Sequence, residues 1–226
     1  MSYQIKEVSL VYDVKKDGGT AALRNITLSL NEAGLIAIKG PSGSGKSSLL
    51  YTMAGLKKPT SGEVFYNSTD LFSMSMPELT SLRRKEFGFI FQQHYLINYL
   101  TVLENTLVPL NVSNESVRRS AMKILERLKM LQYAHKLPHQ LSGGQCQRTA
   151  IARALINNPK VIFADEPTAA LDHKSACEVM EILSEYAKRA MVVFVTHDES
   201  LLQYSDQIIT INDGEIVSKT KRGKQI

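Results

Sequence analysis

Two stretches near the start of the chain, residues 5–12 and 23–30, alternate apolar and polar side chains. Such alternation puts one side of a strand in a core and the other side in water. The pattern therefore predicts two half-exposed strands of an antiparallel edge sheet. Between them, the sequence Asp17-Gly18-Gly19 predicts a hairpin turn.

From residue 34 onward, the apolar residues form short, continuous runs separated by helical segments. Runs of this kind are typical of parallel strands that are buried on both faces. They lie at residues 34–39, 87–91, 161–164 and 191–195, and two further strands are predicted at 207–211 and 215–218, with Asn212-Asp213-Gly214 as the hairpin between them. The pattern predicts an α/β protein with a mainly parallel core sheet and an N-terminal antiparallel β subdomain.

Residues 115–131 differ, because their apolar positions recur at helical spacing. One helix face carries Val117, Ala121, Ile124, Leu125, Leu128 and Leu131. We expect an inserted α-helical subdomain at about residues 94–140. Residues 1–226 are expected to form one domain, since a chain of 226 residues buries a sizeable core without requiring a second one.

The composition narrows the class of protein. The 27 basic and 22 acidic residues give a net charge of +5, but they are interspersed, which favours a solvated surface over a nucleic-acid partner. No run reaches the roughly 18 apolar residues of a membrane span, and the N-terminus has no export pattern, so we expect the protein to stay inside the cell. Cys146 and Cys177 match neither a disulfide framework nor a metal-ligand spacing.

Residues 40–47 read GPSGSGKS and match the phosphate-binding pattern G-x-x-x-x-G-K-[ST]. The motif follows one predicted strand and precedes a predicted helix at 47–54, and these flanking elements disfavour the alternative of a structural glycine turn. Glycines let backbone N–H groups surround phosphate oxygens, and the helix N-terminus adds its positive dipole end. We expect Lys46 to reach the outer phosphates and Ser47 to ligate Mg²⁺.

Two adjacent carboxylates follow the strand at 161–164. Asp165 is a candidate for the Mg²⁺ shell, usually through water, and Glu166 for polarising or orienting the water that attacks the γ-phosphate. His197 follows the strand at 191–195 and is a candidate for a γ-phosphate contact at the same sheet edge. Without the phosphate loop, Asp165 and Glu166 could simply be acidic residues at a helix N-terminus, and His197 could be a structural histidine. The nearby phosphate loop favours the functional roles.

A second anion site is predicted at Ser142, Gly143 and Gly144, which precede a helix predicted at 145–155. They belong to the sequence Leu141-Ser-Gly-Gly-Gln145. With this motif the chain resembles the ATP-binding subunits of ABC transporters, from residue 3 to about residue 219. The resemblance implies the P-loop NTPase fold of ABC ATPases and an ATP hydrolase that uses ATP and Mg²⁺.

The resemblance also implies particular roles. ATP contacts are expected at Gly40, Pro41, Ser42, Gly43, Ser44, Gly45, Lys46, Ser47 and Ser48. Tyr12 resembles the aromatic residue that stacks on adenine, with packing in its strand as the alternative. Gln92 resembles the catalytic-site glutamine that senses Mg²⁺ and couples to the membrane partner. Asp172 resembles the D-loop aspartate, and His197 the switch histidine. Ser48 and Cys146 depart from the commoner family residues, and neither change removes a required donor.

In this family two subunits stack head to tail. The resemblance therefore implies that Ser142, Gly143, Gly144 and Gln145 of one subunit close over the ATP held by a second copy. An integral-membrane permease is the other expected partner, which would hold the protein on the cytoplasmic face of the cell membrane.

Residues 71–110 resemble the branch that includes macrolide exporters and lipoprotein-release systems. A peptide, an antibiotic or a lipoprotein is the implied substrate, and signalling to a cell-wall enzyme without transport is the alternative. The apolar stretch at 95–100 is predicted to line the permease docking groove, or else to pack internally. A DNA- or ribosome-acting ABC ATPase would need coiled-coil arms, a zinc module or tandem cassettes, and a P-loop kinase would need an acceptor site and no LSGGQ sequence.

Overall fold

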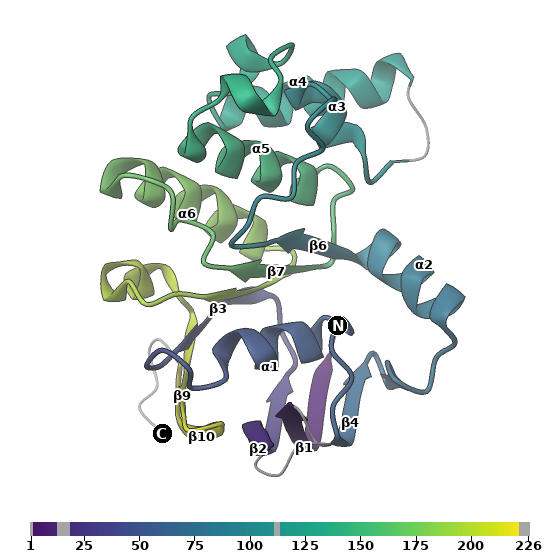
Figure 1. Cartoon of the computed structure of the whole chain (residues 1–226), viewed down its shortest axis with the longest axis vertical. Helices are drawn as coiled ribbons and strands as arrows, with labels where there is room; N and C mark the ends of the chain where they lie inside the picture. The colour runs from purple at the N-terminus through teal and green to yellow at the C-terminus, as the bar shows by residue number, and fades with distance from the viewer. Residues whose placement is uncertain (1, 13–18, 111–113, 222–226) are drawn as a thin grey trace.

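The computed structural model of the chain describes residues 2–12, 19–110 and 114–221. Its core is a six-stranded sheet in the order β10-β9-β3-β8-β7-β6 (Figure 1). All neighbouring pairs are parallel except β9 and β10. The strands are β3 (Gly34–Lys39), β6 (Phe87–Ile90), β7 (Val161–Asp165), β8 (Met191–Val195), β9 (Gln207–Asn212) and β10 (Glu215–Lys221). The predicted buried parallel strands are confirmed.

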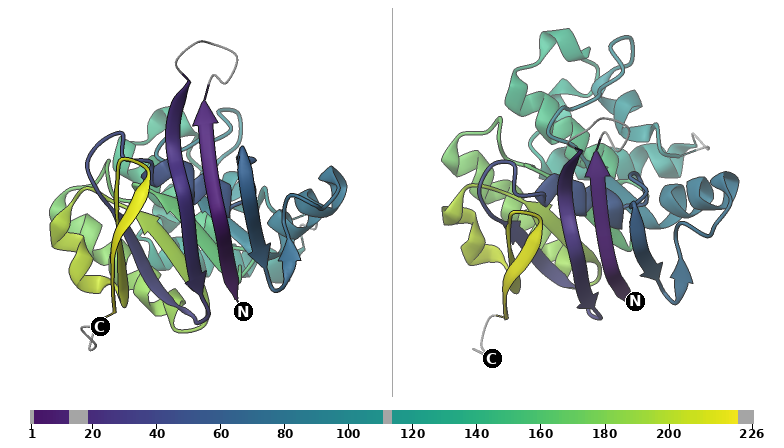
Figure 2. Two further views of the ribbon diagram at one scale, coloured as in Figure 1. Left: turned by 90° about the horizontal axis from the view of Figure 1, so that it is seen from below. Right: turned by 60° about the horizontal axis from the view of Figure 1, so that its bottom comes forward.

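A second, antiparallel sheet has the order β2-β1-β4-β5 and lies across one face of the molecule (Figure 2). It contains β1 (Tyr3–Tyr12), β2 (Thr20–Leu30), β4 (Ser61–Tyr66) and β5 (Thr69–Asp70). The pairing of β1 with β2 confirms the predicted antiparallel edge sheet. The turn predicted at 17–19 falls largely outside the described residues.

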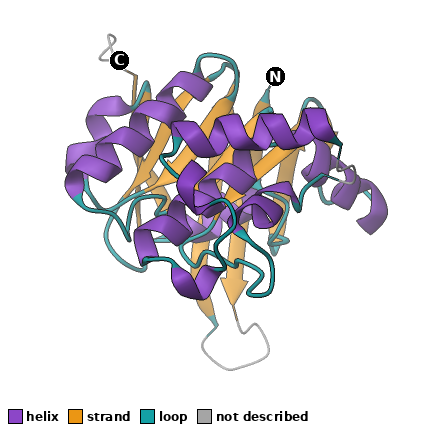
Figure 3. Cartoon of the chain, turned by 90° about the horizontal axis from the view of Figure 1, so that it is seen from above, coloured by secondary structure: helices purple, strands orange, loops and turns teal. Residues whose placement is uncertain are grey.

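The core sheet separates two hydrophobic cores, because successive residues of a strand point to opposite faces. On β7, Val161 and Phe163 join the core around helix α1 (Lys46–Met53) and the antiparallel sheet. Ile162 and Ala164 face the other core. The helices on that side are α3 (Val102–Leu107), α4 (Glu115–Arg127), α5 (Gly143–Leu155) and α6 (His173–Ala187), and Figure 3 shows the molecule from the side that they cover.

The remaining helical segments are α2 (Met76–Glu86) and the short helices η1 (Leu131–Tyr133), η2 (Pro138–Gln140) and η3 (Glu199–Tyr204). Within the described ranges, no helix combines the length and apolar character needed to cross a bilayer. Cys146 on α5 and Cys177 on α6 are half-buried free thiols.

The helix predicted over 115–131 is real but shorter than predicted. It ends at Arg127, because Lys129 takes a left-handed conformation with a φ of 57° and turns the chain. Leu131, predicted on the buried face, is therefore exposed, and Met130 is buried instead. The error arose because helical spacing continues by chance past the last helical residue.

Candidate nucleotide-binding and catalytic site

The phosphate loop connects β3 to α1 and requires glycine at two positions. Gly40 has a φ of 154° and Gly45 a φ of 100°. A Cβ atom on Gly40 would lie 2.0 Å from the Ile211 carbonyl oxygen, and one on Gly45 would lie 2.2 Å from the Ala22 carbonyl oxygen. Both glycines are thus fixed by close backbone approach as well as by conformation. The loop therefore packs between β2 and β9.

The phosphate loop carries several hydrogen-bond donors. Ser44 is only 2% exposed, and its hydroxyl has no hydrogen-bond partner among the described residues. Gly45 caps α1 without a side chain, so the first-turn N–H groups face the loop unsatisfied by any cap. Lys46 Nζ lies back over the loop and donates to the carbonyl oxygens of Gly40 at 3.0 Å and Pro41 at 2.8 Å. These donors fit a phosphate chain.

Pro41, Ser42 and Gly43 form the exposed rim of the loop. Ser48 lies one residue after Ser47 on α1, where its hydroxyl is 3.2 Å from the hydroxyl of Tyr12. The Tyr12 ring is 36% exposed, and the Lys57 ammonium lies 4.4 Å from its centroid. Tyr12 therefore lies beside α1 with one ring face occupied by a cation.

Asp165, at the end of β7, lies against the first turns of α1. Its Oδ1 accepts a hydrogen bond from Ser47 Oγ at 2.9 Å, and its Oδ2 accepts one from the Tyr51 hydroxyl at 2.6 Å. Asp165 is only 3% exposed. A carboxylate and a hydroxyl side by side at a phosphate loop are the hard oxygen donors that Mg²⁺ prefers. The residues present thus fit the ion that the sequence predicted.

The pKa of Tyr51 is raised well above its usual range, first by burial and then by the hydrogen bond to Asp165. Sequence analysis did not single out Tyr51. Its position four residues after Ser47 was the available signal, because residues i and i+4 share one face of a helix.

Glu166 and His197 meet at the carboxyl edge of the core sheet. Glu166 Oε1 and His197 Nδ1 are 2.7 Å apart. The carboxylate side chain is 11% exposed, whereas the imidazole is 73% exposed. Glu166 has a φ of 50°, a left-handed conformation that is uncommon for a residue with a side chain and clusters at functional sites. The backbone turn after Asp165 thus directs two adjacent carboxylates to different partners.

Gln92 follows β6 and is exposed. No hydrogen bond links its amide to Ser47 or Asp165 in the described part of the chain. The structure therefore gathers Ser47, Asp165, Glu166 and His197 near the phosphate loop but does not join Gln92 to them.

The predicted second anion site lines a pocket at the N-terminus of α5. Ser142 is the N-cap of α5, and its hydroxyl accepts from the Gln145 N–H at 3.3 Å while its own N–H donates to Gln145 Oε1 at 2.9 Å. Gly143, Gly144 and Asp172 line the same pocket, and none of the described phosphate-loop residues contributes to it.

Asp172 is the N-cap of α6. Hydrogen bonds from the backbone and side chain of Ser175 lower the pKa of its carboxyl group. Two residues of α5 that no sequence motif indicates, Gln147 and Arg148, form hydrogen bonds to the segments on either side of Asp172. Gln147 is buried and donates to the Pro167 carbonyl at 2.9 Å, and Arg148 donates to the Ser175 hydroxyl at 2.7 Å. These bonds tie α5 to the segment that follows Asp165.

A third region is a groove walled by aromatic and aliphatic residues, which we call the aromatic groove. Its lining includes Tyr51, Leu56, Phe91, Tyr95, Ile97 and Val108. Tyr95 is 63% exposed and Val108 is 45% exposed, which is unusual for such apolar side chains. Arg83, Arg84 and Arg153 also line it. Tyr95 and Ile97 belong to the stretch predicted to line a docking groove.

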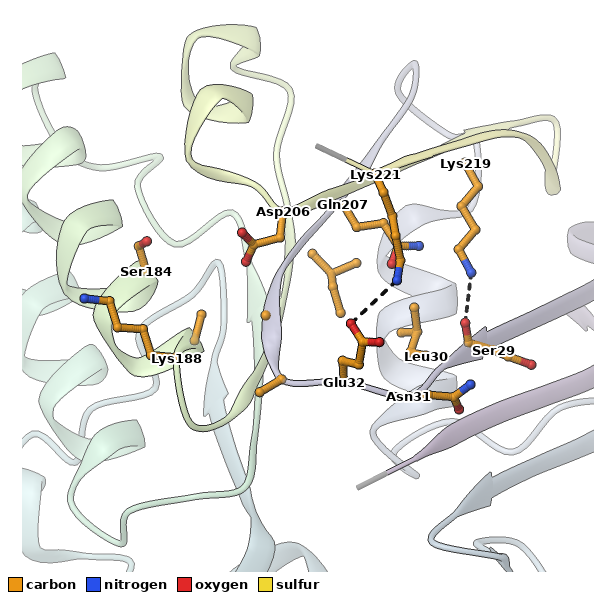
Figure 4. A pocket seen from close by; sticks show the side chains of 14 residues that line it. Ser29, Leu30, Asn31, Glu32, Ser184, Lys188, Asp206, Gln207, Lys219 and Lys221 are labelled. Carbon is orange, nitrogen blue, oxygen red and sulfur yellow. Dashed lines mark hydrogen bonds and ion pairs between the residues drawn. The ribbon is translucent and has the colours of Figure 1, made fainter. Parts of the chain in front are cut away.

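A separate polar pocket is shown in Figure 4. It lies around the start of β3, where Asp206 accepts a hydrogen bond from the Leu35 N–H at 2.8 Å. Lys219 donates to the Ser29 carbonyl at 2.9 Å, and Lys221 is paired with Glu32 at 3.6 Å. Since the phosphate loop follows the other end of β3, this pocket lies away from the predicted nucleotide site.

Comparison with known proteins identifies the family of the chain. The ABC transporter family matches residues 23–169. The uncharacterized ABC transporter ATP-binding protein MJ1508 of Methanocaldococcus jannaschii is 48% identical over 218 residues, covering 95% of this chain and 97% of that protein. The macrolide export ATP-binding/permease protein MacB of Bartonella henselae is 44% identical over 214 residues, covering 90% of this chain but only 32% of MacB. The chain thus spans about a third of that protein.

Comparison with solved structures gives the same family. The dimeric ATP-binding cassette MJ0796, in a post-hydrolysis state with ADP and Pi, matches with a TM-score of 0.93 and 40% identity over 98% of this chain and 100% of that one. Fold and sequence together define a P-loop NTPase. More narrowly, the chain belongs to the ABC transporter family, close to the MacB-like ATP-binding proteins. It is an ATP hydrolase of the ABC type that binds ATP with Mg²⁺.

Proposed function

We propose that the phosphate loop holds the ATP phosphates and that Ser47 and Asp165 hold the Mg²⁺ ion. The observation that carries this proposal is the Ser47–Asp165 hydrogen bond of 2.9 Å, which joins the loop to the end of β7. Lys46 leaves its two carbonyl partners and meets the outer phosphates. Bound Mg²⁺ neutralises charge that develops on the phosphates.

Glu166 serves as the general base or orients the attacking water. Its carboxylate oxygen accepts a hydrogen bond from the water, while His197 holds the other side of the carboxylate or contacts the γ-phosphate. The short Glu166–His197 contact supports this pairing of roles. Gln92 would approach the metal site only after its loop rearranges, and Tyr12 would offer its free ring face to adenine.

Two copies of the chain form the working unit. Support comes from the pocket that contains Ser142, Gly143, Gly144 and Gln145, because no described residue of the phosphate loop lines it. In a head-to-tail dimer, the α5 N-terminus and Asp172 of one copy would reach the ATP of the other. The dimeric MJ0796 cassette offers a precedent.

Specific activity at varied protein concentration tests this function. Mg²⁺-dependent phosphate release per subunit should rise with protein concentration and then level off, because complete sites form only in dimers. Omission of Mg²⁺ provides the control. A constant specific activity across a wide dilution series would contradict the two-copy site.

The dimer drives an integral-membrane permease on the cytoplasmic face of the membrane. The aromatic groove supports this, since its exposed apolar wall and three arginines fit a permease segment with an apolar face and acidic flanks. Val108→Glu should release the chain from membranes that contain its permease, whereas Met76→Glu, at the exposed start of α2, should not. Equal retention of both variants would exclude this groove as the docking site.

The likeness to a macrolide export protein favours export of an antibiotic, and the resemblance of residues 71–110 to its branch adds a peptide or a lipoprotein as candidate substrates. The alternative is a regulatory ATPase that signals through a permease-like partner to a cell-wall enzyme. We propose no nucleic-acid partner, since acidic residues are interspersed with the basic ones. Counting substrate molecules moved per ATP hydrolysed in vesicles separates export from signalling.

A further inference from the structure

One side chain takes part in both the aromatic groove and the predicted magnesium site. Tyr51 lies on α1, one turn after Ser47, and its hydroxyl donates to Asp165 Oδ2 at 2.6 Å. Ser47 occupies the other carboxylate oxygen at 2.9 Å. With both oxygens held, the buried carboxylate has a single rotational orientation. Oδ1 faces Ser47 and Oδ2 faces away from it.

The ring of Tyr51 faces the groove. It is 6.2 Å, centroid to centroid, from the ring of Phe91, which in turn lies 5.4 Å from the ring of Tyr95. All three rings line the aromatic groove. A displacement of the groove wall therefore meets the Tyr51 ring directly, and the hydroxyl at the far end of that rigid ring holds Asp165.

We propose that Tyr51 is a positioning residue for the magnesium carboxylate and that it transmits the arrangement of the groove wall to Asp165. The inference rests on the proposed function, which makes Asp165 and Ser47 the Mg²⁺ ligands. It adds a route from the groove to the metal that needs no movement of Gln92. The route consists of one aromatic contact and one hydrogen bond.

Tyr51→Phe removes the hydroxyl and keeps the ring. Binding of a non-hydrolysable fluorescent ATP analogue is measured over a Mg²⁺ titration and in EDTA. The Mg²⁺ concentration for half-maximal tightening should rise about three- to tenfold, because one hydrogen bond to a charged group is lost. Affinity in EDTA should remain as in wild type. An unchanged Mg²⁺ midpoint would overturn the positioning role, since a purely structural tyrosine would not affect it.

A double-mutant cycle tests transmission from the groove. Phe91→Leu should raise the Mg²⁺ midpoint about twofold when Tyr51 is present and should have no further effect when Tyr51→Phe is already in place. Phe65→Leu, on β4 and outside the aromatic groove, is the matched control and should leave the midpoint unchanged. Equal effects of Phe91→Leu in both backgrounds would overturn the route through the hydroxyl.

Asp165→Asn distinguishes failure of this inference from failure of the proposed function. If Asp165→Asn raises the Mg²⁺ midpoint and Tyr51→Phe does not, the magnesium site stands and the role of Tyr51 is wrong. If Asp165→Asn has no effect on the midpoint, the proposed magnesium site itself is wrong, and the inference falls with it.

Discussion

At the scale of single residues, the neighbouring carboxylates Asp165 and Glu166 differ in their hydrogen-bond partners. Asp165 is held by two hydroxyl groups of α1, whereas Glu166, turned by its left-handed backbone, meets an exposed imidazole. This difference in partners suits the proposed roles, in which Asp165 binds a cation and Glu166 interacts with the proton of water. Two adjacent carboxylates, Asp165 and Glu166, thus suit two different chemical roles.

Glu166→Gln should keep nucleotide affinity and lower hydrolysis by at least about 100-fold, because an amide keeps the shape of the side chain but does not take the proton of water. Phosphate release and size-exclusion chromatography with ATP check this result. The variant should elute as a dimer with ATP and as a monomer without nucleotide. Glu185→Gln, at an exposed ion pair on α6, is the control. Wild-type turnover in Glu166→Gln would refute the assignment.

Lys46→Ala should weaken ATP binding about 10- to 100-fold, since the outer phosphates lose a charge-assisted hydrogen bond. Calorimetric titration measures the change. Lys123→Ala, on the exposed face of α4, should bind ATP like the wild type. The phosphate-loop interpretation would not survive an unchanged affinity in Lys46→Ala.

At the scale of elements, the start of α5 combines a structural and a proposed binding function. Ser142 satisfies the Gln145 N–H as a helix cap, and the glycines beside it leave backbone donors uncovered. A substitution at Ser142 therefore changes both helix stability and access to the donors. Two variants at this position separate the effects.

Ser142→Ala removes the capping hydroxyl without adding bulk and should lower the free energy of unfolding by about 1 kcal/mol. Ser142→Arg loses the same cap and adds a long side chain in the proposed γ-phosphate position of the partner's ATP. It should abolish hydrolysis while the nucleotide affinity of the monomer stays close to normal. Denaturant unfolding, phosphate release and nucleotide titration measure the three quantities. Loss of ATP binding by the Ser142→Arg monomer would mean that both anion sites serve one chain.

The elements differ in how well the sequence predicted them. The buried strands were recognised because β7 and β8 are uninterrupted apolar runs, and the phosphate loop because its motif lies between a strand and a helix. The end of α4 was misplaced, since Lys129 turns the chain inside a continuing apolar pattern. Helix α2 was missed even though its capping box of Ser75 and Glu78 is visible in the sequence.

Prediction of the site from the sequence also stops at contacts between elements. Motifs predicted Ser47, Asp165, Glu166 and His197, and the structure brings these residues together as pairs. The Tyr51 hydroxyl contact was not predictable from a motif, because it depends on how α1 packs against the end of β7. Contacts between elements distant in sequence depend on packing, which local patterns do not encode.

At the scale of the whole molecule, the separation of the two anion sites makes the dimer a testable requirement. In the proposed dimer, each complete site combines the phosphate loop of one copy with the α5 N-terminus of the other. In a dimer of one Lys46→Ala chain and one Ser142→Arg chain, both lesions fall on a single site. The other site then contains an unaltered loop and an unaltered α5 N-terminus.

Mixing the two inactive variants should therefore restore ATP hydrolysis, with a maximum near equal amounts. Random pairing gives half mixed dimers with one intact site of two, so activity should approach about a quarter of wild type if one site suffices. Phosphate release over a series of mixing ratios measures this recovery. The matched control mixes Lys46→Ala with a Ser142→Arg chain that also carries Glu166→Gln. No intact site forms there, because Glu166 serves the phosphate loop of its own chain. Activity equal to the sum of the separate variants at every ratio would contradict a two-copy mechanism in which one intact site suffices.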